Sequence, residues 1–368
     1  MIKFLIKQKL VFLILGILFL AVLLFLINKT SILDKYNFDA EIEEKPLEEM
    51  LGSNFIVGFM GYNLDEETRE IIKYIKPSGI ILYARNCKDE NQLKDLISDL
   101  QEIALDINAY KFFIMIDEEP GGANRLGVFD NAFSLNGPDW SEIYYGTKMM
   151  SEVGINVNLA PIADYPFDDN TFIKRRISVK TIEDLIDFNK NFIQISKENN
   201  IFTTLKHFPG MGMFVDDPHK DIPSSVINQD IFNKSLLIFK QGIDAGVDFV
   251  MTGHAVYENI DSENSATLSS KIVKDILKDQ LGFKGIVITD DLSDMPINEE
   301  RIGRDEVGIK ALKSGHHLIM YSHDIKRTKD IFDSILDKAK SDLELQSVIR
   351  ENYKEIISFK GGNNFSNR

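Results

Sequence analysis

The stretch from Lys206 to Pro223 gathers side chains that can accept or donate protons. It reads K-H-F-P-G-M-G-M-F-V-D-D-P-H-K-D-I-P, and the two glycines and the proline between positions 209 and 212 predict a turn. Asp217 and His219 flank a proline, which favours extended backbone before it, so we expect the two side chains to share a face. A carboxylate beside an imidazole fixes its tautomer and favours its charged form, which suits a proton donor. A solvated loop with this D-x-H spacing by chance is the alternative.

The elements that must position these side chains are short β-rich runs that alternate with amphipathic helical stretches. This alternation predicts a (β/α)8 barrel of the TIM type. A doubly wound open sheet is the main competitor, but no G-x-G-x-x-G follows the first run and the sequence has no Walker loop. The eight predicted strands cover residues 55–60, 79–83, 112–116, 155–159, 201–205, 248–251, 285–289 and 317–321.

Polar side chains follow several of these predicted strands. In a barrel, catalytic groups lie just past the carboxyl ends of the strands, so these positions predict an enzyme site at one rim. His316 and His317 begin the last strand and are expected to be packing or surface groups, while Tyr144 and Tyr145 are expected in the core. The residues at the predicted rim are Asp117, Glu118, Glu119, Asp164, Arg175, Arg176, Lys206, His207, Thr252, His254, Asp290 and Asp291.

Charge and cysteine content narrow the classes of function. The chain of 368 residues has a net charge of −15, which argues against nucleic acid as a partner. Cys87 is its one cysteine, so an intrachain disulfide and a cysteine-based metal site are both excluded.

The amino terminus predicts a membrane anchor. An apolar run from residue 10 to 27 follows Lys3, Lys7 and Lys9, and its length suffices to cross a bilayer. No A-x-A cleavage site follows, which favours an anchor over a cleaved signal peptide. We therefore expect a basic cytoplasmic leader (1–9), a transmembrane signal anchor (10–28), a polar stalk (29–48), an extracytoplasmic catalytic barrel (49–360) and a flexible tail (361–368).

Six motifs carry a resemblance to a known family. K-H-F-P-G at 206–210 is followed by D-x-H and by V-I-T-D-D-L at 287–292. Further matches are G-I-I-L-Y-A-R-N at 79–86, V-N-L-A-P-I-A-D at 157–164 and S-A-T-L-S at 265–269. In this order, over roughly residues 50 to 320, they resemble the family 3 glycoside hydrolases, and more closely the single-domain bacterial β-N-acetylhexosaminidases.

The resemblance implies a role for each matching residue. Asp290 would be the nucleophile and His219 the general acid and base, with Asp217 as its partner. Together they would hydrolyse a glycoside with retention, through a glycosyl-enzyme intermediate, and without a metal or other cofactor. The implied sugar-binding residues are Asp117, Arg125, Arg175, Lys206 and His207.

Three positions depart from the family pattern. Residues 117–125 read D-E-E-P-G-G-A-N-R, where Pro120 replaces the first glycine of the usual D-x-E-G-G-x-V-x-R. Met211 stands where relatives commonly have histidine, and Asp294 is an apparent insertion. Because proline fixes its own φ angle, Pro120 requires a different turn before Arg125, and this makes sugar binding by the loop less secure.

The expected function is removal of terminal β-linked N-acetylglucosamine from peptidoglycan or chitin-type oligosaccharides by a membrane-anchored monomer. A β-glucosidase of the same family is one alternative, although such enzymes usually carry their acid and base in an additional domain. A non-catalytic sugar-binding protein on the same fold is the other.

Overall fold

The structure, a computed structural model, describes residues 42, 44–108, 110–127, 139–169, 171–177, 179–215, 222–293 and 303–362. The predicted leader, anchor and most of the stalk lie outside these residues and stay predictions. Among the described residues, no helix is both long enough and apolar enough to cross a membrane. The chain divides into two compact units, Met1–Pro46 and Leu47–Arg368, and the second contains the barrel.

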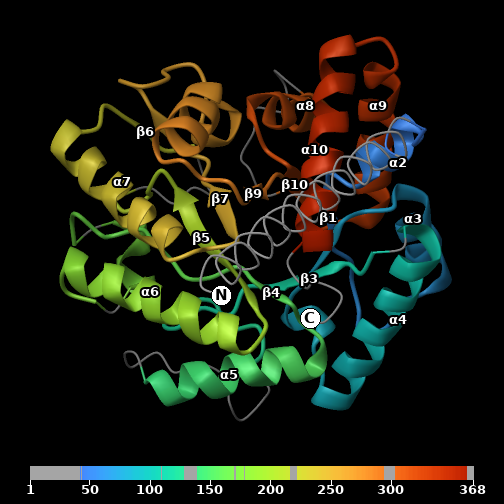
Figure 1. Ribbon diagram of the computed structural model, residues 1–368, viewed down its shortest axis with the longest axis horizontal. Helices are drawn as coiled ribbons and strands as arrows, with labels where there is room; N and C mark the ends of the chain where they lie inside the picture. Colours follow the sequence, from blue (N-terminus) through green and yellow to red (C-terminus); the bar gives the residue numbers. More distant parts are fainter. Residues whose placement is uncertain are drawn as a thin grey trace, which may run out of the picture. The chain divides into compact units, whose positions relative to one another are not determined.

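Eight parallel strands close into a barrel, so the predicted (β/α)8 fold is confirmed (Figure 1). Around the barrel the order is β1-β10-β9-β7-β5-β4-β3-β2, so each strand lies beside its neighbours along the chain and the last pairs with the first. Their bounds are β1 Phe55–Val57, β2 Gly79–Leu82, β3 Phe113–Ile116, β4 Val157–Asn158, β5 Phe202–Phe208, β7 Phe249–Thr252, β9 Ile286–Asp291 and β10 Leu318–Tyr321.

Helices surround the strands (Figure 1). Several begin at a polar cap whose side chain accepts a backbone N–H, as Asp65, Thr181 and Asn228 do. The bounds are α2 Leu47–Gly52, α3 Glu66–Ile75, α4 Glu90–Asn108, α5 Trp140–Val153, α6 Ile182–Glu198, α7 Gln229–Asp244, the π-helix η4 Lys271–Gln280, α8 Arg304–Ser314, α9 Ile325–Ala339 and α10 Leu343–Gly362. The last helix thus runs two residues into the predicted tail.

A second sheet of two short strands lies outside the barrel. The short strands β6 (Ser224–Ser225) and β8 (Val256–Tyr257) pair in parallel.

Tyr144 and Tyr145 on α5 are exposed by 41% and 56%, so their predicted core position is wrong. The buried face of this helix is instead formed by residues such as Met150 and Val153.

Aromatic rings fill the amino-terminal end of the barrel. Phe113, Phe202 and Phe249 each begin a strand, and Phe359 of α10 packs against all three with ring centroids 5.3–6.0 Å away. The neighbouring Lys360 is buried; its Nζ donates to the carbonyl oxygens of Ser78 and Lys111, at 3.0 and 2.9 Å, and lies 4.5 Å from the Phe113 ring centroid. Burial lowers the pKa of Lys360 to about 7. This end is therefore packed rather than open.

The lone cysteine lies just beyond the other end of β2. Cys87 is buried, its Sγ–H donates to the carbonyl oxygen of Tyr83 at 3.4 Å, and burial raises the pKa of the thiol to about 12. The thiol is therefore kept protonated and unreactive in the folded chain.

Candidate active site

Asp290 is the penultimate residue of β9, and its side chain is 30% exposed at the carboxyl end of the barrel. The backbone N–H of Asp291 donates to Asp290 Oδ1 at 2.8 Å, and Nε2 of His207 lies 3.8 Å from Asp290 Oδ2. Burial by itself would raise the pKa of Asp290, but the charges of His207 and His254 and the hydrogen bond from Asp291 lower it to about 2. The carboxylate is thus ionised near neutral pH and ready to attack an electrophilic carbon.

The adjacent Asp291 has a different environment. Its carboxylate is 7% exposed and accepts hydrogen bonds from the backbone N–H of Ser293 and from the hydroxyl and N–H of Ser322. These contacts join β9 to the end of β10. Successive side chains of a strand point to opposite faces. The Asp291 side chain therefore binds Ser293 and Ser322, while the Asp290 side chain stays accessible.

A buried aspartate orients His207. Asp164, fully buried after β4, has Oδ2 at 2.7 Å from Nδ1 of His207 and also accepts the His207 backbone N–H at 3.1 Å. Its Oδ1 accepts the Met211 N–H at 2.7 Å. With Nδ1 engaged by a carboxylate, the Nε2 edge of the imidazole is directed toward Asp290. The three residues therefore form an aligned row, Asp164–His207–Asp290.

Lys206 joins two acids of the loop after β3. Its buried ammonium lies 2.6 Å from Asp117 Oδ1 and 2.6 Å from Glu119 Oε1. Burial alone would lower the pKa of Lys206, yet the two carboxylates raise it overall. Burial likewise disfavours ionised Glu119, but Lys206 and Arg176 together hold its pKa well below its usual range. Lys206 and Glu119 therefore hold one another charged, a suitable arrangement for binding hydroxyl groups by charge-assisted hydrogen bonds.

The two predicted sugar-binding arginines, Arg125 and Arg175, differ from each other in their surroundings. Arg125 lies 3.8 Å from Asp117 Oδ2 and 5.3 Å from the Tyr83 ring centroid, so the altered loop still brings the two ends of its motif together. Gly121, at φ +87°, takes the left-handed position in the turn after Pro120. Arg175 is exposed. Its neighbour Arg176 donates two hydrogen bonds to Glu119 in a bidentate pair, from Nη2 to Oε1 at 2.6 Å and from Nε to Oε2 at 3.1 Å.

The predicted acid and base, His219, and its partner Asp217 lie outside the described residues. The structure does describe both flanks of that segment. On one side the N–H of Phe167 donates to the carbonyl oxygen of Gly212 at 2.8 Å, and on the other the N–H of Val256 donates to that of Pro223 at 2.7 Å. The roles of Asp217 and His219 stay predictions.

Three histidines that the motif analysis left aside are buried. His254 Nδ1 lies 3.0 Å from Thr267 Oγ1, and its charge contributes to lowering the pKa of Asp290. His316 Nε2 lies 2.8 Å from Thr252 Oγ1, and burial lowers the pKa of His316 to about 3. His317 Nδ1 accepts the Val287 N–H at 2.8 Å. His316 and His317 are thus packing groups, one of the two predicted possibilities.

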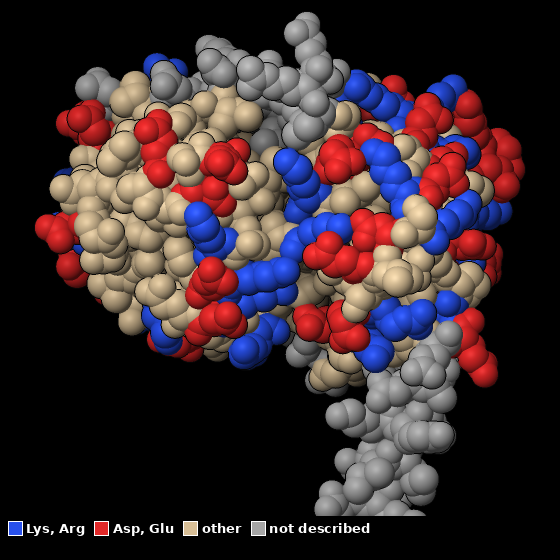
Figure 2. Space-filling view, turned by 90° about the horizontal axis from the view of Figure 1, so that it is seen from above, with Lys and Arg blue, Asp and Glu red and all other residues tan. Residues whose placement is uncertain are grey.

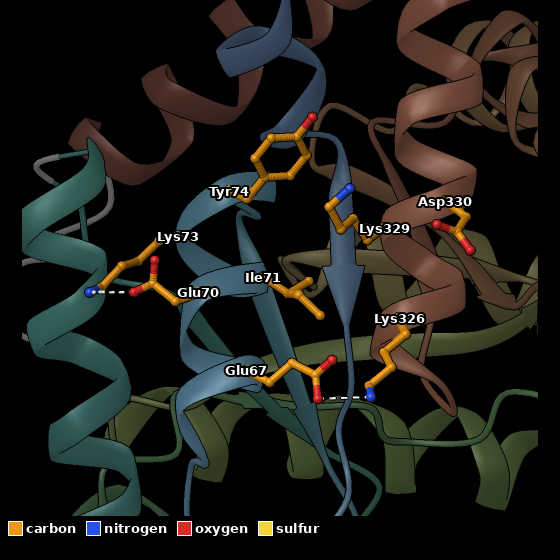
Figure 3. Close-up of a pocket in the computed structure, with 8 residues that line it drawn as sticks. All are labelled: Glu67, Glu70, Ile71, Lys73, Tyr74, Lys326, Lys329 and Asp330. Carbon is orange, nitrogen blue, oxygen red and sulfur yellow. Dashed lines mark hydrogen bonds and ion pairs between the residues drawn. The ribbon is translucent and has the colours of Figure 1, made fainter.

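A hollow lined by charged side chains lies outside this site. The hollow, of about 670 Å³, lies between α3 and α9, and its charges neutralise one another, as in the Glu67–Lys326 and Glu70–Lys73 pairs (Figure 3). Acidic and basic side chains are also interspersed on the face that Figure 2 presents. Within the described part of the chain, no three His, Cys, Asp or Glu side chains are grouped so as to hold a metal ion.

The chain is similar to proteins of a known family. Residues 42–358 match the model of the glycosyl hydrolase family 3 N terminal domain. The chain is 29% identical over 319 residues to the beta-hexosaminidase of Psychromonas ingrahamii, covering 82% of this chain and 92% of that protein. It is 30% identical over 248 residues to the beta-hexosaminidase of Photobacterium profundum, covering 64% and 71%.

Solved structures are similar as well. A glycoside hydrolase family 3 beta-N-acetylglucosaminidase from Paenibacillus superposes with a TM-score of 0.78 at 26% identity, covering 86% of this chain and 63% of that one. This chain therefore spans less than two thirds of the Paenibacillus protein. The beta-N-acetylhexosaminidase from Beutenbergia cavernae superposes with a TM-score of 0.78 at 23% identity, covering 86% and 99%, which shows a shared fold.

Proposed function

This chain belongs to glycosyl hydrolase family 3, and on that premise we propose that it removes terminal β-linked N-acetylglucosamine from cell-wall or chitin-type glycans. Its relatives are named beta-hexosaminidase and a structural neighbour is a family 3 beta-N-acetylglucosaminidase, so the chain is a glycoside hydrolase. The observation that carries the proposed chemistry is the ionised, accessible carboxylate of Asp290 beside an oriented imidazole, while the choice of N-acetylglucosamine follows the names of the relatives.

The proposed reaction has two steps. In the first, an Asp290 carboxylate oxygen forms a bond to the anomeric carbon while the bond from that carbon to the leaving oxygen breaks, and protonated His219 gives its proton to that oxygen. In the second, neutral His219 takes a proton from water, whose oxygen displaces Asp290 from the anomeric carbon. Two displacements retain the β configuration. Asp217 would favour the charged imidazole in the first step.

The charged cluster beside Asp290 would hold the sugar in place. Lys206, Asp117 and Arg125 form a connected set of charges at the end of the barrel that carries the nucleophile. Such groups bind hydroxyls by charge-assisted hydrogen bonds, which supports a monosaccharide bound in one orientation. We further propose that the enzyme acts outside the cytoplasm, held by the predicted membrane anchor at residues 10–28.

Hydrolysis of a chromogenic N-acetyl-β-glucosaminide by residues 45–368 tests the proposal. Asp290→Asn removes the nucleophile without changing its shape, so we expect kcat to fall by about 10³-fold or more. Asp95→Asn, on the exposed face of α4, is the matched control and should retain activity. A matched β-glucoside should turn over more slowly. If neither glycoside is cleaved but N-acetylglucosamine still binds, a sugar-binding protein replaces the hydrolase.

The role of His219 is tested separately with leaving groups of different basicity. A good leaving group needs little protonation, whereas a poor one depends on the acid. His219→Ala should therefore slow the first step much more for an alkyl N-acetylglucosaminide than for a nitrophenyl one. Equal losses for both substrates would contradict the assignment of His219 as the acid.

A further inference from the structure

Glu118 lies between the two acids that contact Lys206, yet its own side chain points elsewhere. It is 1% exposed, and its Oε2 accepts the backbone N–H groups of Arg125 and Leu126, at 2.8 and 2.9 Å. Its Oε1 is buried and has no hydrogen-bond partner among the residues that the structure describes. A buried carboxylate with one unsatisfied oxygen is costly, and such groups persist where the structure needs the contact that they make.

The main chain of Glu118 is itself fixed to the barrel. Its N–H donates to Asn158 Oδ1 at 3.1 Å, and Asn158 Nδ2 donates to its carbonyl oxygen at 2.9 Å. Asn158 ends β4, so the anchor is part of the sheet. Glu118 also forms an antiparallel bridge with Asn124, and the Glu119 N–H donates to the Ala123 carbonyl oxygen at 2.7 Å. The loop from 118 to 126 is therefore a small hairpin, closed by one carboxylate.

We propose that Glu118 is a positioning residue, whose carboxylate holds the hairpin so that Arg125 lies beside Asp117 at the substrate site. The inference rests on the proposed function, since Arg125 and Asp117 matter there as sugar-binding groups. The clamp binds the main chain at Arg125 itself, so it acts on the start of the side chain that reaches Asp117, 3.8 Å away. Pro120 changes the turn of this loop, and the clamp acts at the opposite, closing end of the hairpin.

The clamp carboxyl, Glu118, has a pKa close to neutral pH. Burial raises the pKa of Glu118 to about 7, and the charge of Asp117 adds to this rise. The two backbone N–H groups and the charge of Arg125 act in the opposite direction and lower the pKa. The charge of Glu118 in turn adds to the rise in the pKa of the Cys87 thiol. A carboxyl whose pKa is higher in the folded than in the unfolded chain destabilises the fold progressively as pH rises from about 4.5 to about 7.

The experiment compares Glu118→Ala and Glu118→Gln, with the exposed Glu102→Ala on α4 as the control. Kinetics use the chromogenic N-acetyl-β-glucosaminide, and hydrogen exchange follows the amides of Arg125 and Leu126. Loss of the acceptor in Glu118→Ala should raise KM roughly tenfold and speed exchange of both amides. Glutamine keeps an oxygen acceptor, so Glu118→Gln should keep KM within about threefold of the wild-type value. Its Tm should also rise relative to wild type between pH 5 and pH 8.

The outcomes separate this inference from the proposed function. If the wild type does not cleave the glycoside, the proposed function fails, and fast amide exchange in Glu118→Ala would still establish the clamp. If the wild type is active but Glu118→Ala keeps both its KM and its amide protection, the clamp is wrong while the function stands. Should Glu118→Ala not fold, Glu118→Asp takes its place, because the shorter side chain withdraws the acceptor and must raise KM if the clamp exists.

Discussion

The two ends of the barrel each bury a lysine, and the two lysines behave in opposite ways. Lys206, 2% exposed at the carboxyl end, lies between Asp117 and Glu119, and these carboxylates raise its pKa. Lys360, 3% exposed at the amino end, donates to the backbone carbonyls of Ser78 and Lys111, and burial lowers its pKa to about 7. Equal burial thus gives opposite shifts, because a full negative charge outweighs desolvation and carbonyl dipoles do not.

The difference separates a reactive end from a packed one. At the carboxyl end, charges are held ionised by one another, and this is where Asp290 is accessible. At the amino end, four phenylalanine rings fill the barrel and a single ammonium satisfies loop carbonyls. Substitutions at the two ends should therefore affect different properties, namely turnover at the first and the pH dependence of stability at the second.

Lys206→Met should have the largest effect of the changes compared between the two ends. It leaves buried Glu119 and the partly exposed Asp117 without the ammonium between them, so we expect a loss of roughly 3–5 kcal/mol in the free energy of unfolding. We also expect kcat/KM to fall by about 10²-fold or more, because the proposed sugar site loses its central cation. Urea unfolding and steady-state kinetics measure the two effects, with Lys360→Met as the matched control. Similar activity losses in both variants would remove the distinction between the ends.

Arg176→Ala should be next in size. Its guanidinium makes the two-pronged contact with buried Glu119, so its loss should lower kcat/KM by roughly tenfold or more. Arg175→Ala, one residue earlier and exposed, should stay within about twofold of wild type. The pair decides which arginine belongs to the site: a larger loss for Arg175→Ala would restore the arginine named from the motif.

His207→Gln should move the acid limb of activity. His207 helps to lower the pKa of Asp290 to about 2, so removing its charge raises that pKa toward 3.8. In the proposed mechanism Asp290 must be ionised to attack, and the pH below which kcat/KM declines should therefore increase. Profiles of kcat/KM measured between about pH 3 and pH 7 compare the two proteins. An unchanged acid limb would show that Asp290 owes its ionisation to other groups.

Lys360→Met should have the smallest effect on activity, with kcat/KM within about twofold of wild type. Its effect lies in stability against pH. The lowered pKa means that the folded chain binds fewer protons than the unfolded one between about pH 7 and pH 10.5, so wild-type stability rises with pH in this window. The variant should lose up to about 1 kcal/mol per pH unit of that slope. Urea unfolding at several pH values measures it, and identical slopes would contradict the shift.

The fold could be read from the sequence because its signal is repeated eight times. Each β-rich run is followed by a helical pattern, and eight parallel strands connected in this way can close into a barrel. Details that depend on tertiary packing could not be read. Tyr144 and Tyr145 have helical spacing but lie on the outer face of α5, since periodicity shows that a helix has two faces without deciding the burial of every member.

The site could be predicted as a set of strand ends, and less well residue by residue. Asp290 and Lys206 fall at the rim where the motifs place them. Arg175 and Arg176 are adjacent, and only the local 3₁₀ turn at Phe172–Arg176 determines which one reaches Glu119. Asp164 was visible as a strand-end acid, but its contact with His207 joins segments 43 residues apart, and one sequence contains no record of such a contact.

The buried thiol of Cys87 turns the chain into its own reporter of opening. It is the one cysteine in 368 residues, and in the folded state it is both inaccessible and protonated. A thiol reagent can therefore modify the protein only while the region after β2 is transiently open. The modification rate, followed by mass, gives the frequency or the population of that opening according to whether closing is slower or faster than the reaction. The measurement needs no label to be introduced into the chain.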